Sequence, residues 1–179
     1  MEPTSPDVSL AAVQKKICLL GEFAVGKTSL VRRFIEGRFD DRYLSTIGVK
    51  ISRRQLIRPY GKLNLLLWDL AGSDEFNGQI RANYLRGAAG ALIVCDLTRA
   101  ETLSGFQRYV DQIQAVGLSI PMVFVGNKVD LPESRAISET ELATIAQQFG
   151  TPYFTSSAKT GENVETIFER LAEQIETKG

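Results

Sequence analysis

The sequence has no histidine, only two cysteines and no excess of either charge. Without histidine, a histidine-dependent catalytic triad and most zinc sites are excluded. The 21 lysines and arginines balance the 21 aspartates and glutamates, so no net charge draws the chain to nucleic acid, and we expect no nucleic-acid partner. Cys18 and Cys95 lie in apolar runs. Two buried, reduced thiols are typical of a reducing compartment, so we expect a cytoplasmic protein.

Features that attach a protein to a membrane are also missing. No apolar run approaches the roughly 20 residues that a membrane-spanning helix needs. The first residues lack the basic and apolar regions of a signal peptide, and residue 2 is not the glycine that myristoylation requires. The last residues contain no cysteine for prenylation. We therefore expect no direct membrane anchor.

The length of 179 residues, with 44% hydrophobic and 23% charged residues, is typical of one globular domain. Residues 1–14 contain two prolines and no aromatic residue. We interpret them as a flexible N-terminal leader, followed by a single domain at residues 15–179.

Strand and helix patterns alternate along that domain. Apolar runs typical of strands occupy residues 16–21, 49–58, 63–69, 91–96, 122–127 and 152–155. Helical spacing of apolar residues occupies residues 27–36, 101–116, 138–149 and 163–176. Turn residues at 59–62 predict an antiparallel hairpin, whose polar first strand is typical of a sheet edge. The alternation predicts an α/β three-layer sandwich, with a six-stranded, mostly parallel sheet, one antiparallel edge strand and about five helices.

Residues 21–28 read Gly-Glu-Phe-Ala-Val-Gly-Lys-Thr and match the pattern G-x-x-x-x-G-K-[ST] between a strand and a helix. Such a loop directs backbone N–H groups at phosphate oxygens, and the helix N-terminus adds a favourable dipole. Lys27 would place a cation on the β- and γ-phosphates, and Thr28 would offer a hydroxyl to Mg²⁺. The motif predicts a P-loop NTPase fold, with these phosphate-site residues: Phe23, Ala24, Val25, Gly26, Lys27, Thr28 and Ser29.

Two later segments bear on which base is bound. Asn127-Lys128-Val129-Asp130 and Ser157-Ala158-Lys159 each follow a predicted strand. Guanine presents N–H donors that a carboxylate at Asp130 would accept as a pair, whereas adenine would leave a buried acceptor unmatched at a cost of ~1–3 kcal/mol. This pattern favours guanine over the adenine nucleotide of a P-loop ATPase or small-molecule kinase, which stays as an alternative.

The P-loop and these two segments, together with Thr46–Val49, Leu67–Gly72 and Tyr84–Ala88, resemble the small GTPases of the Ras superfamily, most closely the Rab branch. The resemblance covers roughly residue 15 to the C-terminus. It implies that GTP or GDP and Mg²⁺ are the cofactors. Beyond the P-loop, the residues that it places at the nucleotide are Phe39, Tyr43, Thr46, Gly72, Asn127, Lys128, Asp130, Ser157, Ala158 and Lys159.

The resemblance also implies roles. Asp130 and the amide of Ala158 would recognise guanine, and the stems of Lys128 and Lys159 would cover its faces. Asn127 would brace the segments that bind the base against the P-loop. Phe39 would stack across the base, and Tyr43 would fold over the phosphates. The metal ligands would be Thr28, Thr46 and, through a water, Asp69. The amides of Thr46 and Gly72 would touch the γ-phosphate.

The sequence departs from the family at two positions. Ser73 stands where the family has a glutamine that orients the attacking water, and Phe23 stands where a small P-loop residue is usual. The implied catalytic set is Lys27, Thr46, Gly72 and Ser73. We expect a GTPase that hydrolyses GTP slowly, with a GTP-loaded binding module of negligible hydrolysis as the alternative.

A nucleotide switch of this kind would act through partners. Loss of the γ-phosphate would release the loops at residues 37–48 and 70–79, so we expect an effector protein that reads them. An exchange factor or an activating protein would be a further partner, and a monomer is the family expectation. We interpret the hairpin arginines at 53, 54 and 58, and the Arg32-Arg33 pair, as solvated charges.

Overall fold

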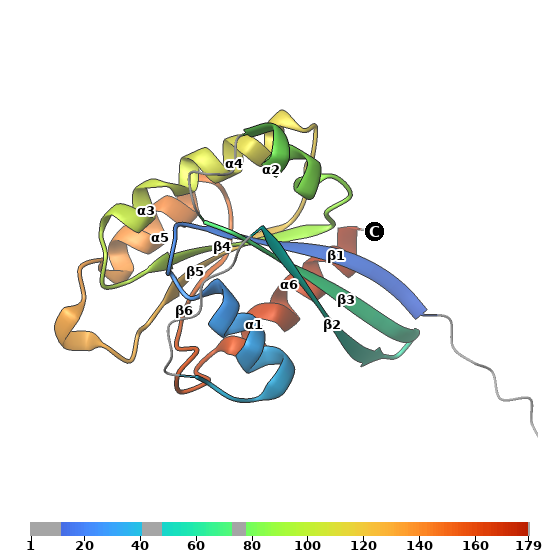
Figure 1. Cartoon of the computed structure of the whole chain (residues 1–179), viewed down its shortest axis with the longest axis horizontal. Helices are drawn as coiled ribbons and strands as arrows, with labels where there is room; N and C mark the ends of the chain where they lie inside the picture. Colours follow the sequence, from blue (N-terminus) through green and yellow to red (C-terminus); the bar gives the residue numbers. More distant parts are fainter. Residues whose placement is uncertain (1–11, 41–47, 73–77, 179) are drawn as a thin grey trace, which may run out of the picture.

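The computed structural model describes the backbone of residues 12–40, 48–72 and 78–178. Its strands are β1 (Ala12–Gly21), β2 (Val49–Arg58), β3 (Gly61–Leu70), β4 (Gly90–Asp96), β5 (Met122–Asn127) and β6 (Tyr153–Ser156). They form a six-stranded sheet in the order β2-β3-β1-β4-β5-β6, in which β2 pairs antiparallel with β3 and the other pairs are parallel (Figure 1). The predicted α/β class is confirmed, including the antiparallel edge strand.

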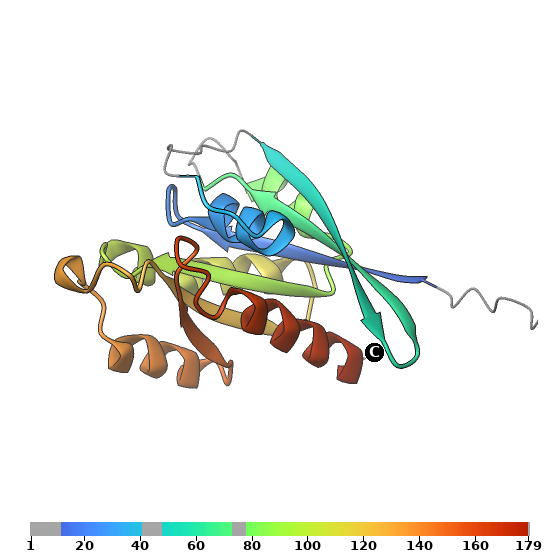
Figure 2. The same cartoon turned by 90° about the horizontal axis from the view of Figure 1, so that it is seen from below.

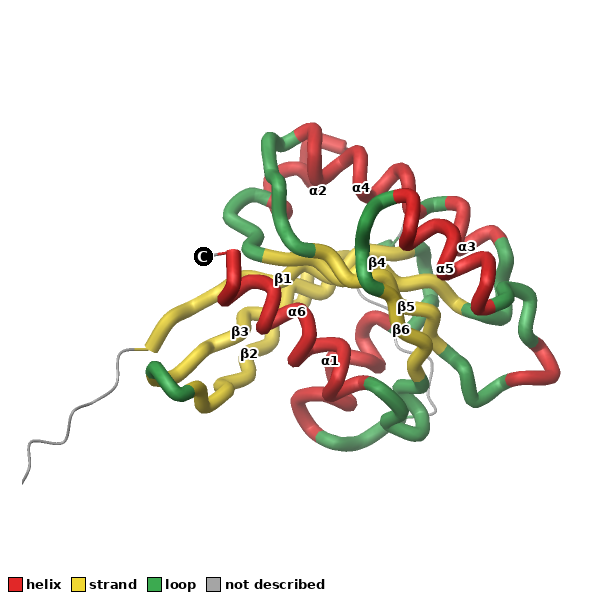
Figure 3. The backbone as a smooth tube through the Cα atoms, turned by 180° about the vertical axis from the view of Figure 1, so that it is seen from behind, coloured by secondary structure: helices red, strands yellow, loops and turns green. Residues whose placement is uncertain are grey.

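Helices cover both faces of the sheet. They are α1 (Lys27–Glu36), α2 (Gly78–Leu85), α3 (Glu101–Ser104), α4 (Phe106–Ala115), α5 (Glu139–Gln148) and α6 (Val164–Lys178), with a 3-10 turn at Pro132–Ser134. Seen from behind, α1 and α6 lie on one side of the sheet, and α2 to α5 lie on the other (Figure 3). Two separate apolar clusters fill these layers, one against each face.

The burial of each strand follows from its place in the sheet. All seven residues of β4 are buried, as a central parallel strand covered on both faces requires. The edge strand β2 instead leaves most of its side chains at least partly exposed. Cys18 and Cys95 are free and buried in the neighbouring strands β1 and β4, as the apolar runs around them predicted.

Apart from shifts of one or two residues at element ends, the structure differs from the sequence prediction in three respects. Strand β1 begins at Ala12, so residues 12–14, which we assigned to the leader, belong to the sheet. The helix predicted over residues 101–116 divides at Gly105 into α3 and α4, at the residue with the lowest helix propensity in the segment. Helix α2 was not predicted, because its sequence has no one-sided apolar pattern.

The hairpin arginines correct another expectation. Arg54 pairs with Glu165 of α6 at 2.6 Å, and Arg58 pairs with Glu169 at 2.9 Å. Arg53 is exposed. Alternate residues of a strand face opposite sides of a sheet, so Arg54 and Arg58 point to α6 while Arg53 does not. Two of the three arginines therefore tie the edge strand to a helix.

Helices α1 and α6 lie side by side on the same face of the sheet, and in the view from below they are in front of it (Figure 2). The rings of Phe34 and Phe168 stack between them, with their centroids 4.1 Å apart. This contact fixes α1, which follows the P-loop directly. Within the part of the chain that the structure describes, no helix is both long enough and apolar enough to cross a bilayer.

Candidate functional site

The P-loop runs from the end of β1 into α1, where its backbone curves tightly. Gly26 has a φ of 102°, a conformation that favours glycine, and a Cβ atom there would collide with the side-chain nitrogen of Asn127. Val25 is fully buried and anchors the loop to the core. The N–H groups of the first turn of α1 follow directly, so the loop has the shape of an anion cradle.

Lys27 lies inside this cradle and is only 6% exposed. Its Nζ donates to the carbonyl oxygens of Gly21 at 2.9 Å and Glu22 at 3.1 Å. Burial lowers the pKa of Lys27 to about 8, an effect that the nearby carboxylate of Asp69 opposes. The ammonium group is therefore still mostly charged at neutral pH, at the place where a polyphosphate needs a cation.

Two oxygen ligands expected for Mg²⁺ lie together beside the cradle. The hydroxyl of Thr28 donates to Oδ2 of Asp69, which lies near the end of β3 and is 1% exposed. Thr28 follows Lys27 at the start of α1, so the two elements bring the pair together from positions 41 residues apart. A hydroxyl and a buried carboxylate are hard oxygen donors of the kind Mg²⁺ prefers, so these residues fit the ion.

Asn127, at the end of β5, connects the P-loop to the segment that follows β6. Its Nδ2 donates to the carbonyl of Val25 at 3.0 Å. Its Oδ1 accepts from the hydroxyl of Ser156 at 3.1 Å and from the N–H of Ala158 at 3.2 Å. The residue is 2% exposed, so these bonds are shielded from water. One amide thus braces both loops, in the manner that the resemblance implied.

The base loop, residues 157–161, is closed by its own polar groups. Ser157 donates from Oγ to Oδ1 of Asp130 at 2.8 Å and accepts from the N–H of Thr160 at 3.0 Å. The N–H of Ala158 is already bonded to Asn127, so a contact with guanine O6 requires that bond to be shared or released. Lys159 is exposed at the surface of the loop.

The ammonium group of Lys128 bonds to the P-loop, whereas the resemblance implied only that the stem of Lys128 covers a face of the base. Its Nζ donates to the carbonyl of Ala24 at 3.1 Å and pairs with Oδ2 of Asp96 at 2.8 Å. Lys128 has a φ of 72°, in the left-handed region, directly after the last residue of β5. Its ammonium group therefore fixes a P-loop carbonyl, a role that the sequence did not reveal.

Asp96 at the end of β4 is the centre of this network. It also accepts from Arg99 Nε at 3.2 Å and from the N–H and hydroxyl of Thr98. Burial by itself would raise the pKa of Asp96, but the hydrogen bonds from Lys128 and Thr98 outweigh it and hold the pKa below its usual value. A second guanidinium nitrogen of Arg99 donates to the carbonyl of Phe23 at 2.5 Å. In the sequence, only the position of Asp96 as the last residue of a predicted strand indicated that it lies near this network.

The remaining expected site residues in the described part of the chain include Phe23 in the P-loop, Phe39 after α1 and Gly72 after β3. Phe23 is half exposed, and Phe39 is partly buried against the cluster beneath the sheet. A Cβ atom on Gly72 would lie 2.6 Å from the backbone nitrogen of Phe23, so no larger residue fits at this point. Gly72 therefore follows β3 in direct contact with the P-loop. Three expected site residues, Tyr43, Thr46 and Ser73, lie outside the described residues.

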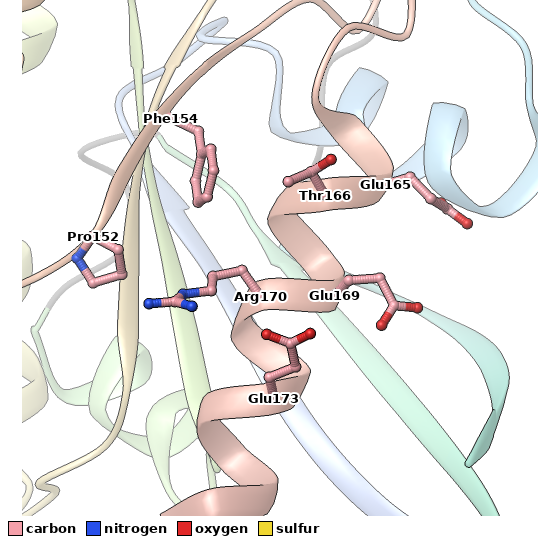
Figure 4. Close-up of a pocket in the computed structure, with 7 residues that line it drawn as sticks. All are labelled: Pro152, Phe154, Glu165, Thr166, Glu169, Arg170 and Glu173. Atoms are coloured by element: carbon pink, nitrogen blue, oxygen red, sulfur yellow. The ribbon is translucent and has the colours of Figure 1, made fainter. Parts of the chain in front are cut away.

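A separate groove of about 490 Å³ lies between β6 and α6 (Figure 4). It is lined by Pro152, Phe154, Glu165, Thr166, Glu169, Arg170 and Glu173. None of these residues belongs to the P-loop or the base loop. The groove is therefore distinct from the candidate site. Two of its glutamates, Glu165 and Glu169, point away from Phe154 and are paired with the hairpin arginines.

Comparison with known proteins agrees with this arrangement. The sequence profile of the Ras family matches residues 16–177. Ras-related protein Rab-27B of Homo sapiens is 33% identical over 172 residues, covering 89% of this chain and 78% of that protein. Ras-related protein RABD1 of Arabidopsis thaliana is 34% identical over 164 residues, covering 91% and 80%. GTP-binding protein YPTM1 of Zea mays is 35% identical over 161 residues, covering 89% and 77%. The chain therefore belongs to the Ras family, as a Rab-like small GTPase.

Proposed function

We propose that this chain is a guanine-nucleotide switch that binds GTP or GDP with Mg²⁺ and hydrolyses GTP slowly. The observation that carries the proposal is the bridge made by Asn127, which bonds to Val25 in the P-loop and to Ala158 in the base loop. The phosphate cradle and the base loop, to which Asp130 is bonded through Ser157, are thereby held at a fixed separation. A nucleoside polyphosphate is the ligand class that needs both.

The residues around the cradle would bind different parts of the ligand, either the phosphate oxygens or the metal ion. Lys27 would exchange its two carbonyl partners for phosphate oxygens. Thr28 and Asp69 would hold Mg²⁺, together with Thr46. When bound, the ion polarises the phosphoryl oxygens and neutralises their charge. Thr28 could keep its hydrogen bond to Asp69 while it binds the ion, because a hydroxyl that donates its one proton still has two lone pairs on the oxygen.

Slow hydrolysis follows from the two departures from the family pattern. Ser73 has no amide and is two carbons shorter than glutamine, so it cannot span an attacking water and the γ-phosphoryl oxygens. Phe23 adds a ring beside the phosphates, and Arg99 holds its backbone carbonyl at 2.5 Å. Any arginine supplied by an activating protein would have to displace that ring.

The nucleotide would be read through the loops at residues 37–48 and 70–79. Gly72 lies against the P-loop, so a γ-phosphate bound there would be sensed by its amide. An effector that prefers one loop state would detect GTP, while an exchange factor or activating protein would reset the switch. We propose that the chain does this as a monomer, in the cytoplasm, without nucleic acid.

Single-turnover hydrolysis of GTP with excess protein tests the proposal. We expect a rate at or below about 10⁻⁴ per second, the order found for a family member that keeps its glutamine. Ser73→Gln should raise this rate, because the amide supplies the missing contacts. Ser119→Gln is the matched control, since Ser119 is exposed and precedes β5, at the opposite end of the strands from the P-loop. No gain in Ser73→Gln over this control would contradict our account of the defect.

The alternative is a GTP-loaded binding module, which Ser73 and Phe23 both favour. Analysis of the bound nucleotide over hours distinguishes the two, because a module retains GTP while a slow switch accumulates GDP. Competition between GTP and ATP tests the remaining class, a P-loop ATPase or small-molecule kinase. Preference for ATP would contradict the role assigned to Asp130.

A further inference from the structure

Arg33 on α1 contacts three backbone carbonyls, although its sequence context predicted a solvated charge. Its Nε donates to the carbonyl of Ala158 at 2.8 Å, and one terminal nitrogen donates to the carbonyl of Lys159. The other terminal nitrogen donates to the carbonyl of Gly37 at 3.0 Å. A planar guanidinium fork can serve several acceptors at fixed angles, which an ammonium group cannot. Arg33 thus joins α1 to a loop 125 residues further along the chain.

The backbone of Ala158 is therefore held at both its N–H group and its carbonyl group. Asn127 accepts from its N–H at 3.2 Å, and Arg33 donates to its carbonyl at 2.8 Å. The loop closes internally through the N–H of Gly161, which donates to the carbonyl of Ser157 at 2.8 Å. Those internal bonds set the shape of the loop. Its placement depends on bonds to other parts of the chain, which are made by Asn127, Arg33 and Asp130. The bonds from Arg33 are charge-assisted and so stronger than neutral ones.

Helix α1 connects this placement to the phosphate site. Lys27 begins the helix and Arg33 lies six residues later, a rise of roughly 9 Å along the axis. The helix is held against α6 by the stacked rings of Phe34 and Phe168. In Figures 1 and 2 the loop that leads into α6 runs beside α1. One rigid helix therefore carries the phosphate cradle at one end and the anchor of the base loop near the other.

We propose that Arg33 is a positioning residue for guanine recognition, which holds the base loop in register with the P-loop and thereby sets how long the nucleotide stays bound. The inference rests on the proposed function, because it assigns Arg33 to the same nucleotide site. Arg33 need not touch the nucleotide. It acts through the peptides of Ala158 and Lys159.

The test compares variants of the full chain in the presence of Mg²⁺, with fluorescently labelled GDP as the probe. Arg33→Met removes the donors but keeps an apolar stem beside Gly161, where an added Cβ atom would lie 3.7 Å from Cδ of Arg33. Arg33→Lys keeps the charge without the fork. Arg170→Met removes an exposed arginine of α6 and controls for the loss of one positive charge.

We expect Arg33→Met to speed GDP dissociation on the order of tenfold, which corresponds to about 1.4 kcal/mol, with binding stoichiometry and association rate unchanged. Arg33→Lys should recover part of the loss, and Arg170→Met should match the unsubstituted chain. The inference is overturned if dissociation from Arg33→Met is unchanged. It is also overturned if the bound fraction falls while the remaining protein releases GDP at the original rate, since that result shows a folding defect alone. Failure of the unsubstituted chain to bind GDP would instead refute the proposed function, and this inference with it.

Discussion

Replacing Asp96 by asparagine should weaken the contacts that hold the backbone of the P-loop in place. The carboxylate of Asp96 holds Lys128 and Arg99, and these two cations bond to the carbonyls of Ala24 and Phe23. Asparagine has the same size and keeps an oxygen for Thr98. Its amide group, however, would present N–H donors to two cations that are themselves donors. The substitution therefore breaks two ion pairs with little change in packing.

The geometry sets the size of the effect. A hydrogen bond to a charged group contributes roughly 1.5–3 kcal/mol. The Asp96 side chain is 2% exposed, but those of Lys128 and Arg99 are 32% and 35% exposed, so water will compensate part of the loss. We expect the free energy of unfolding to fall by about 2–3 kcal/mol in total. For a domain of this size that corresponds to a thermal midpoint lowered by about 5–10 °C.

Urea unfolding at neutral pH measures this difference, with Asp111→Asn on α4 as the matched control. Asp111 is exposed and contacts Gln107 of its own helix, so that variant should unfold like the original chain. GDP dissociation from Asp96→Asn should also be faster, because two P-loop carbonyls lose their anchors.

The pH dependence provides a second check. The pKa of Asp96 is lowered in the folded state, so its contribution to stability is present above the unfolded pKa and is lost as the pH falls through the folded pKa. The gap between the two proteins should therefore be constant from about pH 5 to 8 and should narrow only below about pH 4. A variant as stable as the Asp111→Asn control at neutral pH would refute the reasoning, and so would a gap that does not narrow in acid.

Two further tests concern the core and the hairpin. Burial raises the pKa of Cys18 and Cys95 to about 12, so both thiols should resist a disulfide reagent at pH 8 in the folded protein and react rapidly in urea; rapid labelling of the folded protein would contradict their placement. The side chain of Arg58 is 15% exposed and pairs with Glu169 at 2.9 Å and Glu176 at 2.8 Å. Arg58→Met should lower the free energy of unfolding by about 1–2 kcal/mol in urea titration, since two carboxylates lose their partner, and an unchanged midpoint would show that water replaces these pairs at no cost.

Much of the fold could be read from local patterns. The all-buried strand β4 is a continuous apolar run. The helical pattern predicted over residues 138–149 matches α5, which Ser138 and Glu141 cap with reciprocal hydrogen bonds. The P-loop was equally readable, because its glycines, Lys27 and Thr28 are contiguous and their geometry is set by the strand and helix on either side.

The bonds that hold the site together were not readable in this way. Arg33 looks like an ordinary surface charge in the sequence, and Lys128 was expected only to cover the base. Yet Arg33 bonds to the base loop, and Lys128 bonds to Asp96 and to the P-loop, all far away along the chain. Nothing in linear spacing states which carbonyl a long flexible side chain will reach. That choice is made when the parallel strands align their carboxyl ends and α1 packs on α6. The residue types of the nucleotide site are thus encoded locally, whereas the contacts that set the P-loop and the base loop at a fixed separation arise from packing.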